Sequence, residues 1–337
     1  MKQYLCYAAL TVFAACNAQP PAGNGNAPAG KGFYLDEKAM AFKDLQLYPI
    51  RATSGYIDEH SHFGKYKTLK EGINAGTVKV SERSTDAPAG NLNDNVSGDA
   101  ATVNTLLIEN TSNDTVFLMA GELVKGGKQD RVIAQDMILP PKSGKQNLPV
   151  FCVEHGRWTY DNKEKAGEKA SFSGYQNVSS NTVRKTVATE QNQSAVWRDV
   201  AVVTTANNAD AAAGNTSGTY NGLENNGDFV KKRDEYLKYF KGAFDTTSYV
   251  IGVVAMSGDS VIGSDIFFSP ELFKKQYGNL LYSYVTDAIT KPGKSTDQKK
   301  AVDNFFVRVK KEYAESDSSK NKNQLQHKGK TMHRAAF

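Results

Sequence analysis

The stretch YVIGVVAMSGDSVIGSDIFFSPELF (residues 249–273) decides the fold class of this chain. Tyr249 to Met256 is an apolar run of strand length, Gly258-Asp259 predicts a turn, and Val261 to Phe268 predicts the returning strand. Ser269-Pro270-Glu271 then predicts a helix start, because serine caps free backbone amides and proline fits the first helical position. A hairpin that leads directly into a helix is typical of an α+β protein.

Apolar residues at helical spacing lie on both sides of the hairpin. One helix is expected from Thr186 to Val203, and another covers residues 229–244. A last helix begins at Ser295, with Gln298 in the position that completes a capping box. The apolar stripes of the last two helices are expected in the core: Phe273, Tyr277, Leu280, Leu281 and Tyr284, then Val302, Phe305, Phe306, Val309 and Tyr313.

The first half of the chain is rich in strand signals instead. Short apolar or alternating runs are separated by Gly, Pro and Asn between residues 44 and 158, which predicts a β-rich, sandwich-like half packed on the mixed half. Cys152 closes the last run, and we expect it to be a small buried hydrophobe. Residues 33–315 form one large α+β domain or two tightly packed lobes, at about 33–158 and 159–315.

The N-terminus predicts export. Residues 1–18 have a lysine near the start and a short apolar run, which is typical of a signal peptide. Cys16 follows Phe13-Ala14-Ala15 as in a lipobox, so we expect a lipid on Cys16 and a place on the periplasmic side of the cell envelope; simple cleavage after Ala18 is the alternative. Residues 19–32 are rich in Pro, Gly and Asn and predict a flexible tether.

Charge and motifs exclude several classes of function. The net charge of +5 is mild, and the basic residues of the tail at 316–337 predict a solvated, disordered end, so no nucleic-acid partner is expected. The chain lacks a Walker A loop, a GxSxG elbow and a strand-linked GxGxxG. His60-x-His62 after Asp58-Glu59 is a weak metal pattern that fits an exposed polar loop better, so neither a metal nor a cofactor is predicted.

The segment GELVKGGKQDR (residues 121–131) is the best candidate for a site. Its glycines let the backbone turn tightly, successive amides in such a turn can bind an anion, and Arg131 can hold a phosphate with two donors. Glu122 and Asp130 are candidate acid–base groups, with Arg131 as a clamp. The alternative is a hairpin turn held by local ion pairs. The predicted ligand-binding residues here are Lys125, Gly126, Gly127, Lys128, Gln129 and Arg131.

Two other polar clusters are candidates to join this loop. Glu154-His155-Gly156-Arg157-Trp158 follows a strand, and from it we expect Glu154, Arg157 and Trp158 to contact the ligand. Gln193 and Trp197 lie one helical turn apart and form the third cluster. The alternative for the second cluster is an ordered strand end in which Trp158 packs and Arg157 pairs with Glu154.

Five motifs in a fixed order resemble a known family. They are GELVKGGKQDR (121–131), a PP turn (140–141), VEHGRW (153–158), QSAVW (193–197) and DIFFSPELF leading to LLYSY (265–284). The set resembles a bacterial domain family named for its association with ADP-ribosylglycohydrolases and rhodanese-phosphatases. Because the name records gene neighbourhoods, the resemblance implies no defined activity. It does strengthen the expectation that Glu122, Gly126, Gly127, Gln129, Asp130 and Arg131 form a site.

Three functions remain open from the sequence. The favoured one is a binding module for a small anion that is phosphate-, nucleotide- or ADP-ribose-like. The second is a hydrolytic enzyme with Glu122 or Asp130 as base and Arg131 as clamp. The third is a cell-envelope scaffold, which predicts an exposed apolar patch. The expected contacts outside the chain are the membrane, through the lipid, and the small anion.

Overall fold

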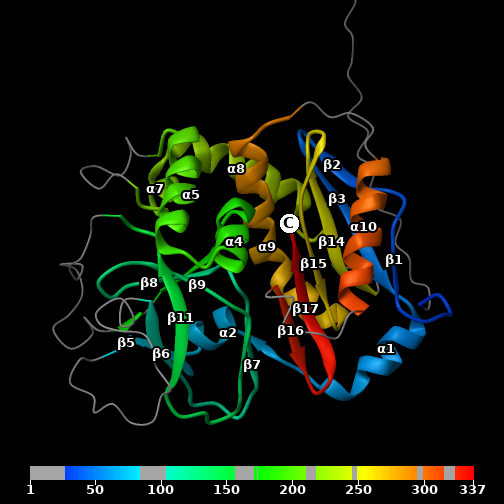
Figure 1. Ribbon diagram of the computed structural model, residues 1–337, viewed down its shortest axis with the longest axis horizontal. Helices are drawn as coiled ribbons and strands as arrows, with labels where there is room; N and C mark the ends of the chain where they lie inside the picture. The colour runs from blue at the N-terminus through cyan, green and yellow to red at the C-terminus, as the bar shows by residue number, and fades with distance from the viewer. Residues whose placement is uncertain are drawn as a thin grey trace, which may run out of the picture.

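The computed structural model describes residues 27–83, 104–155, 171–172, 174–209, 218–244, 249–293, 299–314 and 323–337. The predicted signal peptide, Cys16 and the first part of the predicted tether lie outside the described residues. The protein is α+β, as the hairpin predicts: antiparallel sheets and helices share one chain (Figure 1).

The predicted hairpin is the centre of a seven-stranded sheet. It consists of β14 (Val250–Ser257) and β15 (Ser260–Phe267), which pair antiparallel. Strand β3 (Leu45–Ala52), from the N-terminal part of the chain, pairs with the other edge of β14. Strands β1 and β2 both pair with β3. The remaining strands of this sheet are β1 (Phe33–Leu35), β2 (Met40–Phe42), β16 (Gln324–His327) and β17 (Lys330–Ala336).

Two further sheets are built mainly from strands of the β-rich half, with β12 and β13 added from the mixed half. One has the order β12-β5-β6-β11-β9-β8-β13, and a small one has the order β10-β7-β4. Cys152 ends β11 and is fully buried, as expected. These strands are β4 (Lys67–Thr68), β5 (Val78–Glu82), β6 (Thr105–Asn110), β7 (Val116–Leu118), β8 (Glu122–Lys125), β9 (Arg131–Ile133), β10 (Met137–Leu139), β11 (Gln146–Cys152), β12 (Ser171–Phe172) and β13 (Gly174–Val178).

Helix α9 (Pro270–Thr290) joins the two halves. Ser269 caps it through the amide of Leu272, and its predicted apolar stripe is buried. It packs on β14 and β15 and also on β13, so it lies between the sheets (Figure 1). Helix α10 (Lys299–Ala314) covers the opposite face of the central sheet with Val302, Phe306, Val309 and Tyr313. The other helices are α1 (Ser54–His60), α2 (Leu69–Asn74), α4 (Asn181–Thr189), α5 (Gln193–Ala206), α7 (Gly222–Asn225) and α8 (Gly227–Phe240).

The C-terminal segment differs most from expectation. Residues 324–336, predicted as part of a disordered tail, form the hairpin β16–β17, and β17 pairs with β15 inside the central sheet. The polar residues of β17 are buried because distant partners meet them: His333 Nε2 lies 3.0 Å from Asp265 Oδ1, and His333 Nδ1 lies 2.5 Å from Asp136 Oδ2. The composition of residues 316–337 gives no sign of these partners, because Asp136 and Asp265 lie elsewhere in the chain.

Two smaller differences have local causes. The end of the predicted tether is bound, because the carbonyls of Pro28, Gly30 and Gly32 accept hydrogen bonds from the first amides of α1 and its cap, and so satisfy them. The single helix expected from Thr186 to Val203 is two helices, α4 and α5. Asn192 caps the second helix through the amide of Ala195.

The described residues include no helix that is both long enough and apolar enough to span a bilayer.

Candidate functional site

The amides of the loop between β8 and β9 are occupied by the protein's own carboxylates. The amide of Gly126 donates to Asp130 Oδ1 (3.2 Å), that of Lys128 to Glu82 Oε1 (2.9 Å), and that of Asp130 to Glu154 Oε2 (2.8 Å). The sequence predicts that successive amides of this loop bind one anion, whereas these three amides donate to three different carboxylates of the protein itself. Glu82 comes from β5 and Glu154 from the segment after β11, so the alternative of purely local ion pairs is also incomplete.

Arg131 and Gly127 lie inside this arrangement. The Arg131 side chain is fully buried; its Nη1 donates to the Gln129 carbonyl (2.8 Å), and its Nη2 is 3.9 Å from Glu82 Oε1. Gly127 has φ +59°, and a Cβ there would lie 2.6 Å from Glu82 Oε1 and 2.7 Å from Phe172 Cζ. The predicted exposed cradle is therefore corrected to a closed turn in which Gly127 is required by packing.

The second and third sequence clusters meet beside this loop, as the sequence suggested. Gln129 Nε2 donates to the Glu154 carbonyl (2.9 Å), and the Gln193 side chain bonds both the amide and the carbonyl of Cys152 (2.9 Å each). The His155 and Trp197 rings make an edge contact with centroids 4.8 Å apart. Arg157 and Trp158 lie outside the described residues. Lys125 turns to another partner, because its Nζ donates to Asn221 Oδ1 (2.6 Å).

Glu122 has a different set of partners from Arg131. Its carboxylate accepts from the amide of Met119 (2.8 Å) and from the Tyr175 hydroxyl (3.0 Å), and it is fully buried. Burial raises the pKa of Glu122 to about 7, although both hydrogen bonds lower it. The predicted pairing of Glu122 as base with Arg131 as clamp is not seen among these contacts.

The histidine pattern is not on a strand. His60 ends α1 and is buried, with Nδ1 2.8 Å from the Tyr56 carbonyl, and His62 lies in the 3-10 turn Ser61–Phe63 that follows. Among the described residues, no group of three or more His, Cys, Asp or Glu side chains has the geometry to hold a metal ion.

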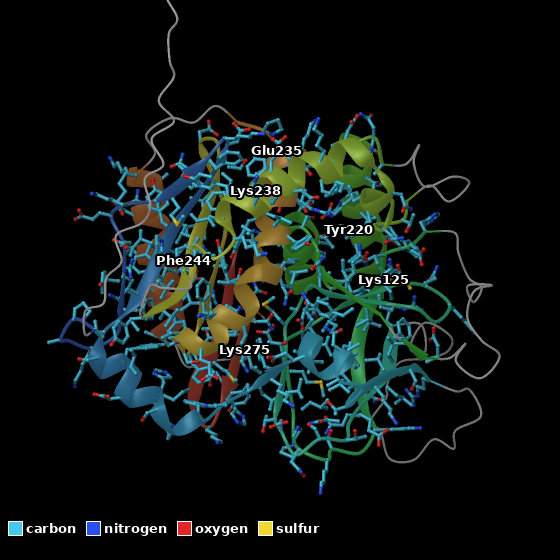
Figure 2. All side chains as sticks on the ribbon, turned by 180° about the vertical axis from the view of Figure 1, so that it is seen from behind. Lys125, Tyr220, Glu235, Lys238, Phe244 and Lys275 are labelled. Atoms are coloured by element: carbon cyan, nitrogen blue, oxygen red, sulfur yellow. The ribbon has the colours of Figure 1, made fainter. Side chains whose placement is uncertain are left out.

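A basic cleft lies between α2, the end of α8 and α9, and the sequence reasoning missed it. Its volume is about 580 Å³, within the range of small-molecule sites. Figure 2 labels Lys238 of α8 and Lys275 of α9 on this side of the molecule. Five lysines and one glutamate line it, with two tyrosines and two leucines: Lys70, Lys238, Lys241, Lys274, Lys275, Glu71, Tyr277, Tyr282, Leu237 and Leu281. We call it the lysine cleft.

The single acid of the lysine cleft is already engaged. Glu71 forms a capping box with Thr68 at the start of α2, and its Oε1 is 3.5 Å from Lys275 Nζ. Lys275 also donates to the Tyr66 carbonyl (2.8 Å). Within the described part of the chain, no ion pair is formed by Lys238 or Lys241, which lie where the negative end of α8 stabilises cations. The side chains that line the cleft therefore carry more positive than negative charge.

Lysines from three separate segments make this cleft, which explains why the sequence did not reveal it. The local signals are the adjacent pair Lys274-Lys275 and the helical spacing of Lys238 and Lys241. Such patterns usually mark a solvated helix face, and only the packing of α8 against α9 brings them together.

One protein-family model matches almost the entire described part of the chain and so identifies its family. The model of the ARG and Rhodanese-Phosphatase-superfamily-associated Protein domain matches residues 36–337. The chain belongs to this family. The match includes β16 and β17, so the C-terminal hairpin is part of the ARPP-1 domain. No curated protein and no solved structure matches the chain.

Proposed function

We propose that this protein is a binding module for a small polyanion and that the lysine cleft is the site. The observation that carries the proposal is the excess of five lysines over one glutamate in a cleft of about 580 Å³. Lysine ammonium groups act as point charges that suit phosphate or sulfate groups in several orientations. Tyr277, Tyr282 and the two leucines add apolar surface, which suits a nucleotide- or ADP-ribose-like ligand better than a bare ion.

The lysine cleft replaces the 121–131 loop as the favoured site for the same ligand class. The amides of that loop already bind Asp130, Glu82 and Glu154. An external anion there would have to displace carboxylates that are themselves hydrogen-bonded, at the cost of leaving buried charges unpaired.

Fluorescence titration with pyrenetetrasulfonate tests the site, because the sulfonates of this probe stay ionised at every working pH. We expect the double variant Lys238→Gln/Lys241→Gln to lose roughly 30-fold in affinity, since each nearby cation contributes about 1 kcal/mol in water and the loss of two amounts to about 2 kcal/mol. Lys231→Gln/Lys232→Gln is the matched control, because it removes the same charge from exposed positions of α8 outside the cleft. Equal losses in the two variants, or no binding by the wild type, would refute the proposal.

A thermal-shift panel of phosphate, sugar phosphates and ADP-ribose then identifies the ligand class. Stabilisation that disappears in the Lys238→Gln/Lys241→Gln variant assigns the ligand to the cleft.

We also propose that the protein is exported and carries a lipid on Cys16. The short apolar run at the start of the chain supports this proposal. Mass spectrometry of the mature N-terminus tests it: acylated Cys16 is expected, and a free Gln19 terminus would exclude the lipid.

A further inference from the structure

Glu122 is connected through Tyr175 to Lys70, one of the lysines that line the cleft. The Lys70 ammonium is 5.8 Å from the centroid of the Tyr175 ring, and the hydroxyl of that ring donates to Glu122 Oε1 (3.0 Å). Glu122 itself does not line the cleft. One aromatic side chain therefore separates a buried carboxyl group from a cation of the proposed site.

A second chain of contacts starts from the same lysine. Lys70 Nζ donates to Asn279 Oδ1 (3.3 Å), and Asn279 Nδ2 donates to Gln276 Oε1 (3.1 Å). Gln276 is buried in α9 and lowers the pKa of Glu122, but its Nε2 has no hydrogen-bond partner among the residues that the structure describes, so this second route stops short of the carboxylate. The route through Tyr175 is the one that reaches Glu122 by a hydrogen bond, and it ends on Lys70, an exposed side chain that can move away from the ring.

The other ionisable groups that face Glu122 are few among the described residues. Tyr175 comes from β13, and Asp136, from the turn before β10, raises the pKa of Glu122 by repulsion. Asp136 is engaged by His333 of β17 and by the amide of Ala120 (2.7 Å). Arg184 of α4 packs on Gly121 but donates to Asp265.

We propose that Glu122 is a positioning residue for the lysine cleft, which holds Lys70 against the wall when it is ionised and frees Lys70 for a bound anion when it is protonated. This inference rests on the proposed function. An ionised carboxylate strengthens the hydrogen bond from Tyr175 and makes the ring a better partner for the Lys70 cation. Its charge also opposes any anion in the cleft.

The proposal requires that anion binding and proton uptake are coupled. Because the protonated form favours the anion, anion binding must favour protonation, and the Glu122 carboxylate takes its proton from solvent. The pKa of Glu122 is about 7, so the coupling falls in the neutral range. Ordinary lysine and glutamate side chains titrate outside that range.

Titration of the whole protein with pyrenetetrasulfonate between pH 6 and pH 8 tests the coupling. We expect affinity to fall about fivefold as the pH rises, the low end of usual couplings between sites. Glu122→Gln should remove the pH dependence and Tyr175→Phe should weaken it, and neither should abolish binding. Glu271→Gln, which removes an exposed acid from the first turn of α9 outside the cleft, should keep it.

The outcomes separate this inference from the proposed function. Binding that depends on Lys238 and Lys241 but is equally strong at pH 6 and pH 8 would overturn the role of Glu122 and leave the binding site intact. No binding at either pH would overturn both. If Glu122→Gln and Tyr175→Phe fail to fold, Lys70→Met decides: a pH dependence that survives in this surface variant contradicts the proposal.

Discussion

Arg184 and Asp265 form a two-point ion pair in which both side chains are 1% exposed: Arg184 Nη1 is 3.0 Å from Asp265 Oδ2, and Nη2 is 2.5 Å from Oδ1. Asp265 also accepts from Tyr284 and contacts His333. The pair therefore joins α4, β15, α9 and β17 at one point, where the α-helical layer meets the central sheet.

Breaking this pair should destabilise the fold strongly. Asp265→Asn leaves the Arg184 charge buried without its counter-ion, so we expect a loss of about 3–5 kcal/mol in the free energy of unfolding. Urea denaturation measures it. Glu190→Gln is the control, because the Arg198–Glu190 pair is about half exposed and should contribute less than about 1 kcal/mol. A similar small effect for both variants would contradict the role of the pair.

His333 should make the folded protein less stable as the pH becomes alkaline. Burial lowers the pKa of His333, but Asp136 and Asp265 more than offset this effect and raise it to about 9. Since the unfolded value is near 6.5, this contribution is complete below about pH 6.5 and is lost as the pH rises to about 9. Unfolding at pH 6, 7.5 and 9 should show a decline that His333→Gln reduces and that His62→Gln, at an exposed position, leaves unchanged.

Glu122 should lower the free energy of unfolding as the pH rises, in a lower pH range than His333. Its folded pKa of about 7 exceeds the unfolded value of 4.5, so the folded protein holds the proton more tightly and stability falls as the pH rises from about 4.5 to 7. The loss is on the order of 3 kcal/mol. Glu122→Gln should flatten the curve in this range, and an unchanged slope in that variant would assign the titration to another group.

Gly121→Ala should be costly for two reasons. Gly121 has φ +92°, and a Cβ there would lie 2.5 Å from Arg184 Cγ. Backbone strain and the displaced arginine together should lower the free energy of unfolding by about 2–4 kcal/mol. Gly144→Ala is the control, since a Cβ at Gly144 meets nothing within 4 Å. Equal thermal midpoints for the two variants would show that Arg184 can move aside.

The sequence is informative where the structural signal is local. The signals for the turn at Gly258-Asp259 and for the cap at Ser269 lie in adjacent residues. They are enough to predict the hairpin and α9. The strands of the first half that contain clear apolar runs are predicted for the same reason, whereas β8 lies inside the segment 121–131 that is read as a turn. Strand β17 is not, because KTMHRAA lacks an apolar alternation and is stabilised by Asp136 and Asp265, which are remote in the chain.

The candidate site shows the same division. The glycines of residues 121–131 correctly predict a tight turn. Gln193 and Trp197 lie against the second cluster, but their partners, the Cys152 backbone and the His155 ring, are not predicted by the sequence. The sequence could not show that Glu82 and Glu154 enter the turn and occupy its amides. Nor could it show the lysine cleft, whose cations become neighbours only through helix packing.

The position of β17 also constrains when the protein can fold. Strand β17 follows β15 in the chain only after α9 and α10, yet it lies between β15 and β16 and brings His333 to a buried carboxylate. During synthesis β15 leaves the ribosome well before β17, so in that interval β15 keeps an open edge and Asp265 lacks one of its partners. The central sheet can therefore close only after the two intervening helices and β17 have been made.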